Sequence, residues 1–176
     1  MSGHNKWTQI KRKKEKTDAQ KSKIFGKLAR LITEEVRRAN GNPDSASVKT
    51  AVERAREANM PNENIERAIK KASTESGPKL ENVTYEAYGP GGAALIIEAL
   101  TDNRNRASQE IKTIMSKFGL NLANPGSASW AFKKTGLVWT PINKIPVSEE
   151  TKRELDGLIE ALSESDEVQN IYSNAE

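Results

Sequence analysis

The sequence of 176 residues contains no cysteine, and this absence removes several kinds of chemistry at once. Disulfide bonds, cysteine-ligated zinc and thiol nucleophiles are all excluded, because each of them needs the sulfur atom. Histidine is nearly absent as well, since His4 is the only one. A Ser-His-Asp triad could therefore be built only around that residue. We expect a protein that is not an enzyme, with no catalytic residue, no metal site and no cofactor.

Long apolar segments are also missing. No apolar run approaches the ~20 residues that a membrane-spanning helix needs. The first residues are basic and no apolar segment follows them, so the sequence predicts no secretory signal. Hydrophobic residues make up 35% of the chain and charged residues 30%, which is too apolar for a disordered protein. We expect a cytoplasmic protein without a membrane partner or a small-molecule substrate.

Charge is distributed unevenly along the chain. Residues 1–40 hold 12 Lys and Arg against 4 Asp and Glu, a net charge of +8. Residues 41–79 and 80–143 carry +1 each, whereas residues 144–176 hold 3 basic against 9 acidic residues, a net charge of −6. Clustered Lys and Arg are the electrostatic footprint of nucleic-acid binding, and a merely solvated basic surface is the alternative.

The strongest basic cluster lies in residues 1–16, which show no sustained helical or strand period and are predicted to form a mobile arm. Stacking of an aromatic ring on bases contributes about 1–3 kcal/mol per base. Lysine and arginine add a sequence-independent attraction to phosphates. For Trp7, the alternative to stacking on bases is packing onto the helical bundle. The candidate nucleic-acid contacts in the arm are Lys6, Trp7, Lys11, Arg12, Lys13 and Lys14.

Three amphipathic helices are predicted next, over about residues 18–40, 45–58 and 62–72, followed by a linker. On a helical wheel, the apolar side chains of the first helix lie opposite its basic ones. Its apolar stripe comprises Ile24, Phe25, Leu28, Leu31, Ile32 and Val36. The opposite face presents Lys23, Lys27 and Arg30, which extend the candidate nucleic-acid contacts of the arm. Residues 17–79 are thus predicted to be a three-helix nucleic-acid-binding head.

The pattern changes from helical to alternating after residue 80, which starts the second predicted domain. Strands are expected over about residues 83–88, 93–99, 127–132, 137–140 and 168–172, and helices over 103–118 and 151–163. From residue 93 onward this order is βαββαβ, the ferredoxin-like arrangement, with one extra leading strand. The predicted fold class is therefore α + (α+β): a three-helix bundle followed by a ferredoxin-like domain over residues 80–176.

Two motifs in this domain invite a phosphate-binding interpretation. The turn Tyr88-Gly89-Pro90-Gly91-Gly92 joins two strands rather than a strand and a helix, and is read as a tight hairpin. Arg104 and Arg106 fall in the first turn of a predicted helix, where the helix dipole disfavours cations. They need either carboxylate partners, such as Asp102 and Glu110, or an anionic ligand such as phosphate, and the sequence leaves both open.

Several motifs, in order along nearly the whole chain, resemble the YebC/PmpR family. They are Gly3-His4-Asn5-Lys6-Trp7, Lys21-Ser22-Lys23-Ile24-Phe25-Gly26-Lys27-Leu28, Ala58-Asn59-Met60-Pro61, Tyr88-Gly89-Pro90-Gly91-Gly92, Thr101-Asp102-Asn103-Arg104-Asn105-Arg106 and Asp166-Glu167-Val168-Gln169-Asn170-Ile171-Tyr172-Ser173-Asn174. Family members usually have a third domain inserted within the second. Here residues 137–140 lead almost directly into the C-terminal αβ segment, which indicates a short form without that insertion.

The resemblance implies one of two functions. Many family members are described as DNA-binding transcriptional regulators, while others act on the ribosome, where bacterial members help it through consecutive prolines. The sequence shows no obvious recognition helix for the major groove, and an arm with one tryptophan suits irregular RNA surfaces. We therefore favour binding to rRNA in the ribosome, with double-stranded DNA second. The sequence lacks the His, Cys and carboxylate arrangement that a nuclease would need, which argues against an enzyme acting on RNA. A module that binds only other proteins is a further alternative.

Overall fold

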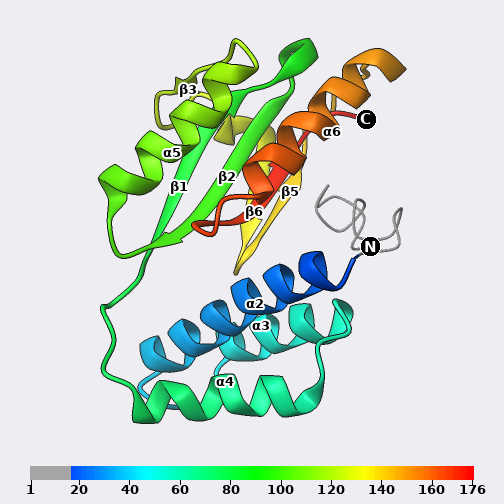
Figure 1. The fold of residues 1–176 in the computed structure, drawn as a ribbon. Helices are drawn as coiled ribbons and strands as arrows, with labels where there is room; N and C mark the ends of the chain where they lie inside the picture. The colour runs from blue at the N-terminus through cyan, green and yellow to red at the C-terminus, as the bar shows by residue number, and fades with distance from the viewer. Residues whose placement is uncertain (1–16) are drawn as a thin grey trace. The chain divides into compact units, whose positions relative to one another are not determined.

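The computed structural model describes residues 17–176 (Figure 1). The described chain forms two compact units. The first is helical and ends at Leu80; the second comprises Glu81–Glu176 and combines a sheet with helices. None of the described helices is both long enough and apolar enough to cross a membrane.

The helical unit consists of α2 (Asp18–Arg38), α3 (Ala46–Glu57) and α4 (Asn62–Thr74). Thr17 begins α2 through a capping box, because its hydroxyl accepts the Gln20 N–H while the Gln20 side chain accepts the Thr17 N–H. Asn40 and Gly41 end the helix with φ angles of 53° and 83°. The Gly41 N–H then bonds to the Val36 carbonyl, as in a typical glycine-type helix end.

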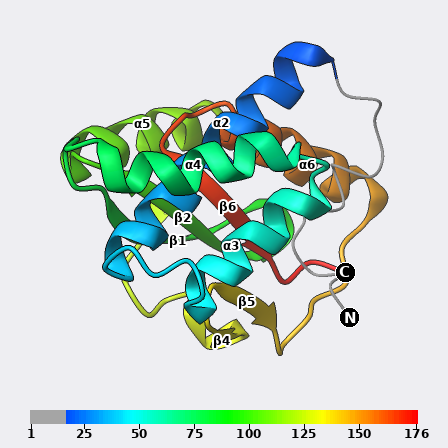
Figure 2. The same ribbon diagram turned by 90° about the horizontal axis from the view of Figure 1, so that it is seen from below.

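α2 packs along α3 and α4, as Figures 1 and 2 show from two sides. The expected apolar stripe of α2 is confirmed: five of its six residues are buried and Phe25 is half-buried. The Thr33 hydroxyl donates a hydrogen bond of 3.0 Å to the Ala68 carbonyl and so ties α2 to α4. The other buried apolar residues of the unit are Val48, Ala51, Ala55, Met60, Ile65 and Ala68.

The second unit is built on a four-stranded antiparallel sheet in the order β3-β1-β2-β6. Its strands are β1 (Glu81–Tyr88), β2 (Ala94–Thr101), β3 (Leu122–Ala123) and β6 (Val168–Ser173). Helices α5 (Arg104–Lys117) and α6 (Glu149–Ser163) cover one face (Figure 1). Their apolar sides form one core with the sheet, centred on Leu95, Ile97, Ile111, Leu158 and Ile171.

A separate hairpin of β4 (Phe132–Thr135) and β5 (Val138–Pro141) lies on the other side of the sheet (Figure 2). Ile96, Phe132 and Tyr172 form a second core there, with Trp139 against its edge. Because both faces of the sheet are covered, β2 is buried on both sides. This explains why apolar residues follow one another along β2, interrupted only by the half-buried Glu98 before Thr101, instead of alternating with polar ones.

The predicted class, a helical unit followed by an α+β unit, is confirmed, and the helix boundaries lie within about two residues of the expected ones. The strand arrangement differs in detail from βαββαβ. The leading strand β1 lies inside the sheet, the short β3 was not expected, and the predicted hairpin forms its own two-stranded sheet.

The strand expected over residues 127–132 is instead a turn and a short 3-10 helix, η2 (Ser129–Ala131). The reason is a side chain: Glu86 on β1 accepts hydrogen bonds of 2.7 Å from the N–H groups of Gly126, Ala128 and Ser129. Backbone donors that are used in this way cannot join a β-ladder. Pairing therefore begins only at Phe132.

Candidate nucleic-acid interface

The expected contacts of the arm, Lys6, Trp7, Lys11, Arg12, Lys13 and Lys14, lie outside the residues that the structure describes. The expected contacts on the next helix are described. Lys23, Lys27 and Arg30 all lie on α2, spaced by four and three residues, which places them on one face. Lys23 and Arg30 are half-buried, whereas Lys27 is only 5% exposed and is not a surface cation in this structure.

Two further arginines at the end of α2 hold the chain that follows α4. Arg37 donates to the Glu75 carbonyl over 2.6 Å, and Arg38 donates to the Leu80 carbonyl over 3.2 Å. Arg38 also pairs with Glu35 at 3.1 Å. Cations are favourable in the last turn of a helix, where the dipole is negative. These two arginines thus have a structural task within the helical unit.

The two compact units carry opposite net charges. From residue 17 to Leu80 the helical unit holds 13 Lys and Arg against 9 Asp and Glu, a net charge of +4. The second unit, Glu81–Glu176, holds 9 against 14, a net charge of −5. The first 16 residues, which precede the helical unit in the sequence, hold 6 Lys and Arg against 1 Glu and so add a net charge of +5. An anionic ligand is therefore attracted to the N-terminal part of the chain.

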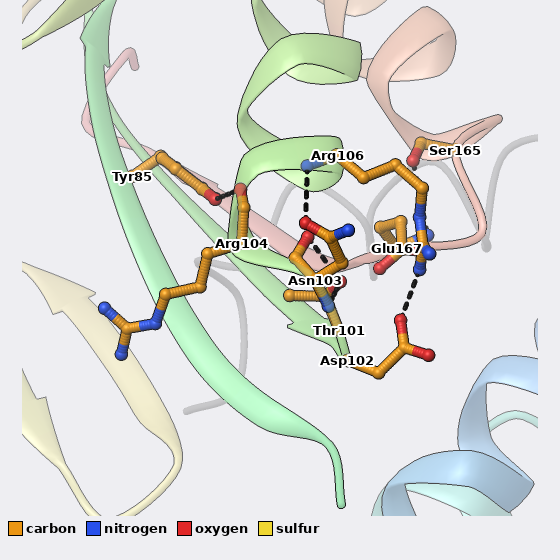
Figure 3. Close-up of polar contacts among 8 residues, drawn as sticks. All are labelled: Tyr85, Thr101, Asp102, Asn103, Arg104, Arg106, Ser165 and Glu167. Carbon is orange, nitrogen blue, oxygen red and sulfur yellow. Dashed lines mark hydrogen bonds and ion pairs between the residues drawn. The ribbon is translucent and has the colours of Figure 1, made fainter. Parts of the chain in front are cut away.

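The turn that leads from β2 into α5 contains the other two candidate cations (Figure 3). The Thr101 hydroxyl accepts the Asn103 N–H at 2.9 Å, which shapes the turn. The Asn103 side-chain oxygen then accepts the Arg106 N–H at 3.0 Å and caps the helix. The Tyr85 hydroxyl donates to the Arg104 carbonyl at 3.2 Å. Burial raises the pKa of Tyr85, with an opposing effect of Arg104 and a reinforcing one of Glu167.

Both arginines are paired with carboxylates, and their side chains leave the helix in opposite directions (Figure 3). Arg104 Nε lies 2.6 Å from Glu81 Oε2. Arg106 Nη2 lies 2.6 Å from both Asp102 Oδ1 and Glu167 Oε1. These hydrogen bonds, above all the one to Glu167, raise the pKa of the Arg106 guanidinium.

The geometry at this turn favours the salt-bridge alternative over an open phosphate site. Of the two carboxylates expected as partners, Asp102 does pair with Arg106, but Glu110 is not a partner. The other two partners are Glu81, which pairs with Arg104, and Glu167, which pairs with Arg106. Neither could be found from local sequence, because they lie 23 and 61 residues away from the arginines that they contact. Among residues 17–176, no cluster of three or more His, Asp or Glu side chains has the arrangement of a metal site.

Family models match almost the entire chain. The TACO1/YebC protein N-terminal domain matches residues 5–75, and the TACO1/YebC second and third domain matches residues 80–140 and 136–175. The chain belongs to the TACO1/YebC family. The match to the second and third domain falls into two segments that meet at the β4–β5 hairpin. This is the place where the sequence predicts that an inserted domain is missing.

Relatives are similar over most of this chain and carry the name "probable transcriptional regulatory protein". One from Fervidobacterium nodosum is 47% identical over 96% of this chain and 68% of its own length. One from Finegoldia magna is 45% identical over 96% and 70%. One from Pelotomaculum thermopropionicum is 51% identical over 78% and 58%. The chain thus spans between 58% and 70% of the length of these relatives.

A solved structure has the same fold. The crystal structure of a conserved hypothetical protein from Aquifex aeolicus aligns with a TM-score of 0.77 and 32% sequence identity, over 93% of each chain. This relative is named a conserved hypothetical protein, so the likeness supports the fold and the family.

Proposed function

We propose that this chain is a nucleic-acid-binding regulator of gene expression that acts on ribosomal RNA and assists translation where ribosomes stall, for example at consecutive prolines. The observation that carries the proposal is the separation of charge along the chain, from the basic arm and helical unit to the acidic second unit. The names of the relatives support a role in gene expression, which is the coarser part of the proposal.

Binding begins with the arm. Lys6 and Lys11–Lys14 contact phosphates, and Trp7 stacks on an unpaired base. Lys23 and Arg30, on one face of α2, extend the contact toward the helical unit. The acidic second unit is repelled by phosphates and so favours binding in one orientation.

The helical unit offers a reason to prefer RNA to duplex DNA. α3 and α4 are joined by only four residues, as in a helix-turn-helix, which would make α4 the recognition helix. Such a helix meets base edges with its N-terminal residues. The first turns of α4 instead expose Glu63 and Glu66, and Glu63 engages Arg67 at 2.9 Å. Carboxylates at that end disfavour insertion between two phosphate backbones.

A pair of charge-matched variants tests the proposal. One variant replaces Lys11, Arg12 and Lys13 with glutamate; the other replaces Lys112, Lys117 and Arg153, which are exposed in the second unit. Both change the net charge equally. Binding to purified ribosomes, to rRNA fragments and to duplex DNA is then measured in the same buffer. We expect the arm variant to lose ribosome and rRNA binding and the control variant to keep it. Equal binding by both variants would refute the role of the arm.

A DNA-binding transcriptional regulator is the second candidate. It is favoured by the names of the relatives and by the short α3–α4 connection. In the same experiment it requires sequence-dependent binding to duplex DNA that exceeds binding to rRNA at equal salt. That result would replace the ribosomal proposal.

A further inference from the structure

Three aromatic side chains of the second unit are exposed, and Trp130 is the most exposed of them. Trp130 lies in η2, just before the β4–β5 hairpin, and is 55% exposed. Tryptophan is highly buried on average in folded proteins, so a tryptophan that is half open to solvent suggests an interaction surface. Trp139, on β5 of the same hairpin, shows the contrast: it packs edge-on against Phe132 and donates to Glu98 at 2.9 Å.

The exposed ring is held in place by hydrogen bonds rather than left free. Trp130 Nε1 donates to the Tyr88 hydroxyl over 2.9 Å, and the Tyr88 hydroxyl donates to the Ser127 carbonyl. The same loop is fixed by the three N–H groups that Glu86 accepts. The one polar atom of the indole is therefore satisfied within the protein. A ring ordered in advance loses little entropy when a flat ligand stacks on it.

The segment that contains Trp130 is basic although its unit is acidic. Residues 118–148, which follow α5, hold three lysines and no aspartate or glutamate, whereas the second unit as a whole has a net charge of −5. Lys133 follows Trp130 by three residues, is exposed, and has no carboxylate within 4.0 Å among the described residues. Lys134 is already occupied, since it lies 5.0 Å from the Trp139 ring centre and 3.9 Å from Glu98.

We propose that Trp130 is a stacking platform for an unpaired base of single-stranded nucleic acid, with Lys133 at the neighbouring phosphate. An ordered aromatic ring, followed three residues later by an exposed lysine without a carboxylate partner, matches the chemistry of a nucleotide in a single strand. This second contact, about 120 residues beyond the arm in the sequence, rests on the proposed nucleic-acid binding. It gives the second unit a direct part in recognition.

Binding of fluorescent oligoribonucleotides by the full chain tests the platform, with a single strand and its duplex compared. The variants are Trp130→Ala, Trp130→Phe and, as a matched control, Ile142→Ala. Ile142 is a suitable control because it is an apolar residue of similar exposure, 58% against 55% for Trp130. Its backbone N–H also bonds to the carbonyl of Ala131, the residue that follows Trp130. We expect Trp130→Ala to weaken single-strand binding about five- to 150-fold, as for other stacked bases. Trp130→Phe should restore most of it.

The outcomes separate this inference from the function on which it rests. If the wild-type chain binds no RNA, both fall. If it binds, the arm variant does not, and Trp130→Ala binds like the wild type, only the platform is refuted. Equal losses for Ile142→Ala, or equal losses on the duplex, would indicate a general apolar surface and also refute stacking. Photo-crosslinking of the wild-type chain to thiouridine RNA is independent of variant folding: a crosslinked peptide containing Trp130 supports the platform, and crosslinks elsewhere alone contradict it.

Discussion

At the scale of single residues, the side chain of Glu86 fixes the conformation of the loop that leads into η2. It lies on β1, is 9% exposed, and accepts hydrogen bonds from three backbone N–H groups, two in the loop before η2 and one at its first residue. Burial by itself would raise the pKa of this carboxyl. The three backbone hydrogen bonds outweigh that effect and hold the pKa below its ordinary value of 4.5.

Replacing Glu86 with glutamine should destabilise the second unit by roughly 1–3 kcal/mol, because an amide accepts these hydrogen bonds less strongly than a carboxylate does. The pH dependence has a definite sign. Since the folded pKa is lowered, the advantage of the wild type is fully present above pH 4.5 and is lost as the pH falls through the lowered value. Urea unfolding of both proteins between pH 3 and 7 measures this, and a pH-independent difference would contradict the account.

Arg104 and Arg106 should differ in their effect on stability although both form ion pairs. Arg104 and its partner Glu81 are exposed, and exposed pairs contribute little. Glu167 is only 8% exposed, so Arg106→Ala would leave a buried carboxylate without its cation. We expect Arg106→Ala to have a clearly lower Tm than the wild type, and Arg104→Ala to have nearly the same Tm as the wild type. Adding Glu167→Gln to Arg106→Ala should recover part of it; equal melting of both single variants would exclude this explanation.

At the scale of elements, the turn between β1 and β2 shows how a glycine positions a helix. Gly91 and Gly92 both have positive φ, 69° and 76°. A Cβ atom on Gly91 would lie 2.6 Å from Thr151 Cγ2 on α6, whereas one on Gly92 would meet nothing within 4 Å. Of these two glycines, only Gly91 is required by the close packing of the turn against α6.

Alanine at these two positions separates backbone strain from steric clash. Gly92→Ala should cost about 1–2 kcal/mol, the penalty of a left-handed conformation for a residue with Cβ. Gly91→Ala should cost about 1–3 kcal/mol more, because the added methyl group overpacks the contact with α6. Chemical denaturation of both variants provides the comparison. If the two substitutions cost the same, the predicted clash is absent.

The sequence predicted the elements better than their arrangement. Helix caps are local signals: Thr17, Ser45 and Asn103 begin α2, α3 and α5 as their residue types suggest. Strand order is not local. Nothing near residues 81–88 shows that β1 pairs with both β2 and β3, since the second pairing brings Ala87 to Leu122.

For the candidate site too, the local features could be predicted from the sequence, whereas the partners of its residues could not. Basic faces and helix starts follow from composition and spacing, so Arg104 and Arg106 were expected at the first turn of α5. The carboxylates that neutralise them come from β1 and from the residue before β6. The exposure of Trp130 depends equally on tertiary structure, because its sequence neighbours Ala128, Ala131 and Phe132 are all buried.

At the scale of the whole molecule, the central feature is charge separated between two compact units. We expect the arm and the helical unit to attract a polyanion, because the second unit is acidic outside residues 118–148. Attraction of this kind releases counterions and so weakens with salt. Reversing Lys11, Arg12 and Lys13 should lower the slope of log K against log salt by about 2 for single-stranded RNA, if each contacts one phosphate. An unchanged slope would mean that the arm does not touch phosphate.

Ultraviolet crosslinking in cells, followed by sequencing of the nucleic acid recovered with the tagged chain, tests the central claim most directly. We expect reads concentrated at a few positions of ribosomal RNA, and their loss in the variant with glutamate at residues 11, 12 and 13. Recovery of promoter DNA without ribosomal RNA would contradict it and establish the chain as a DNA-binding transcriptional regulator.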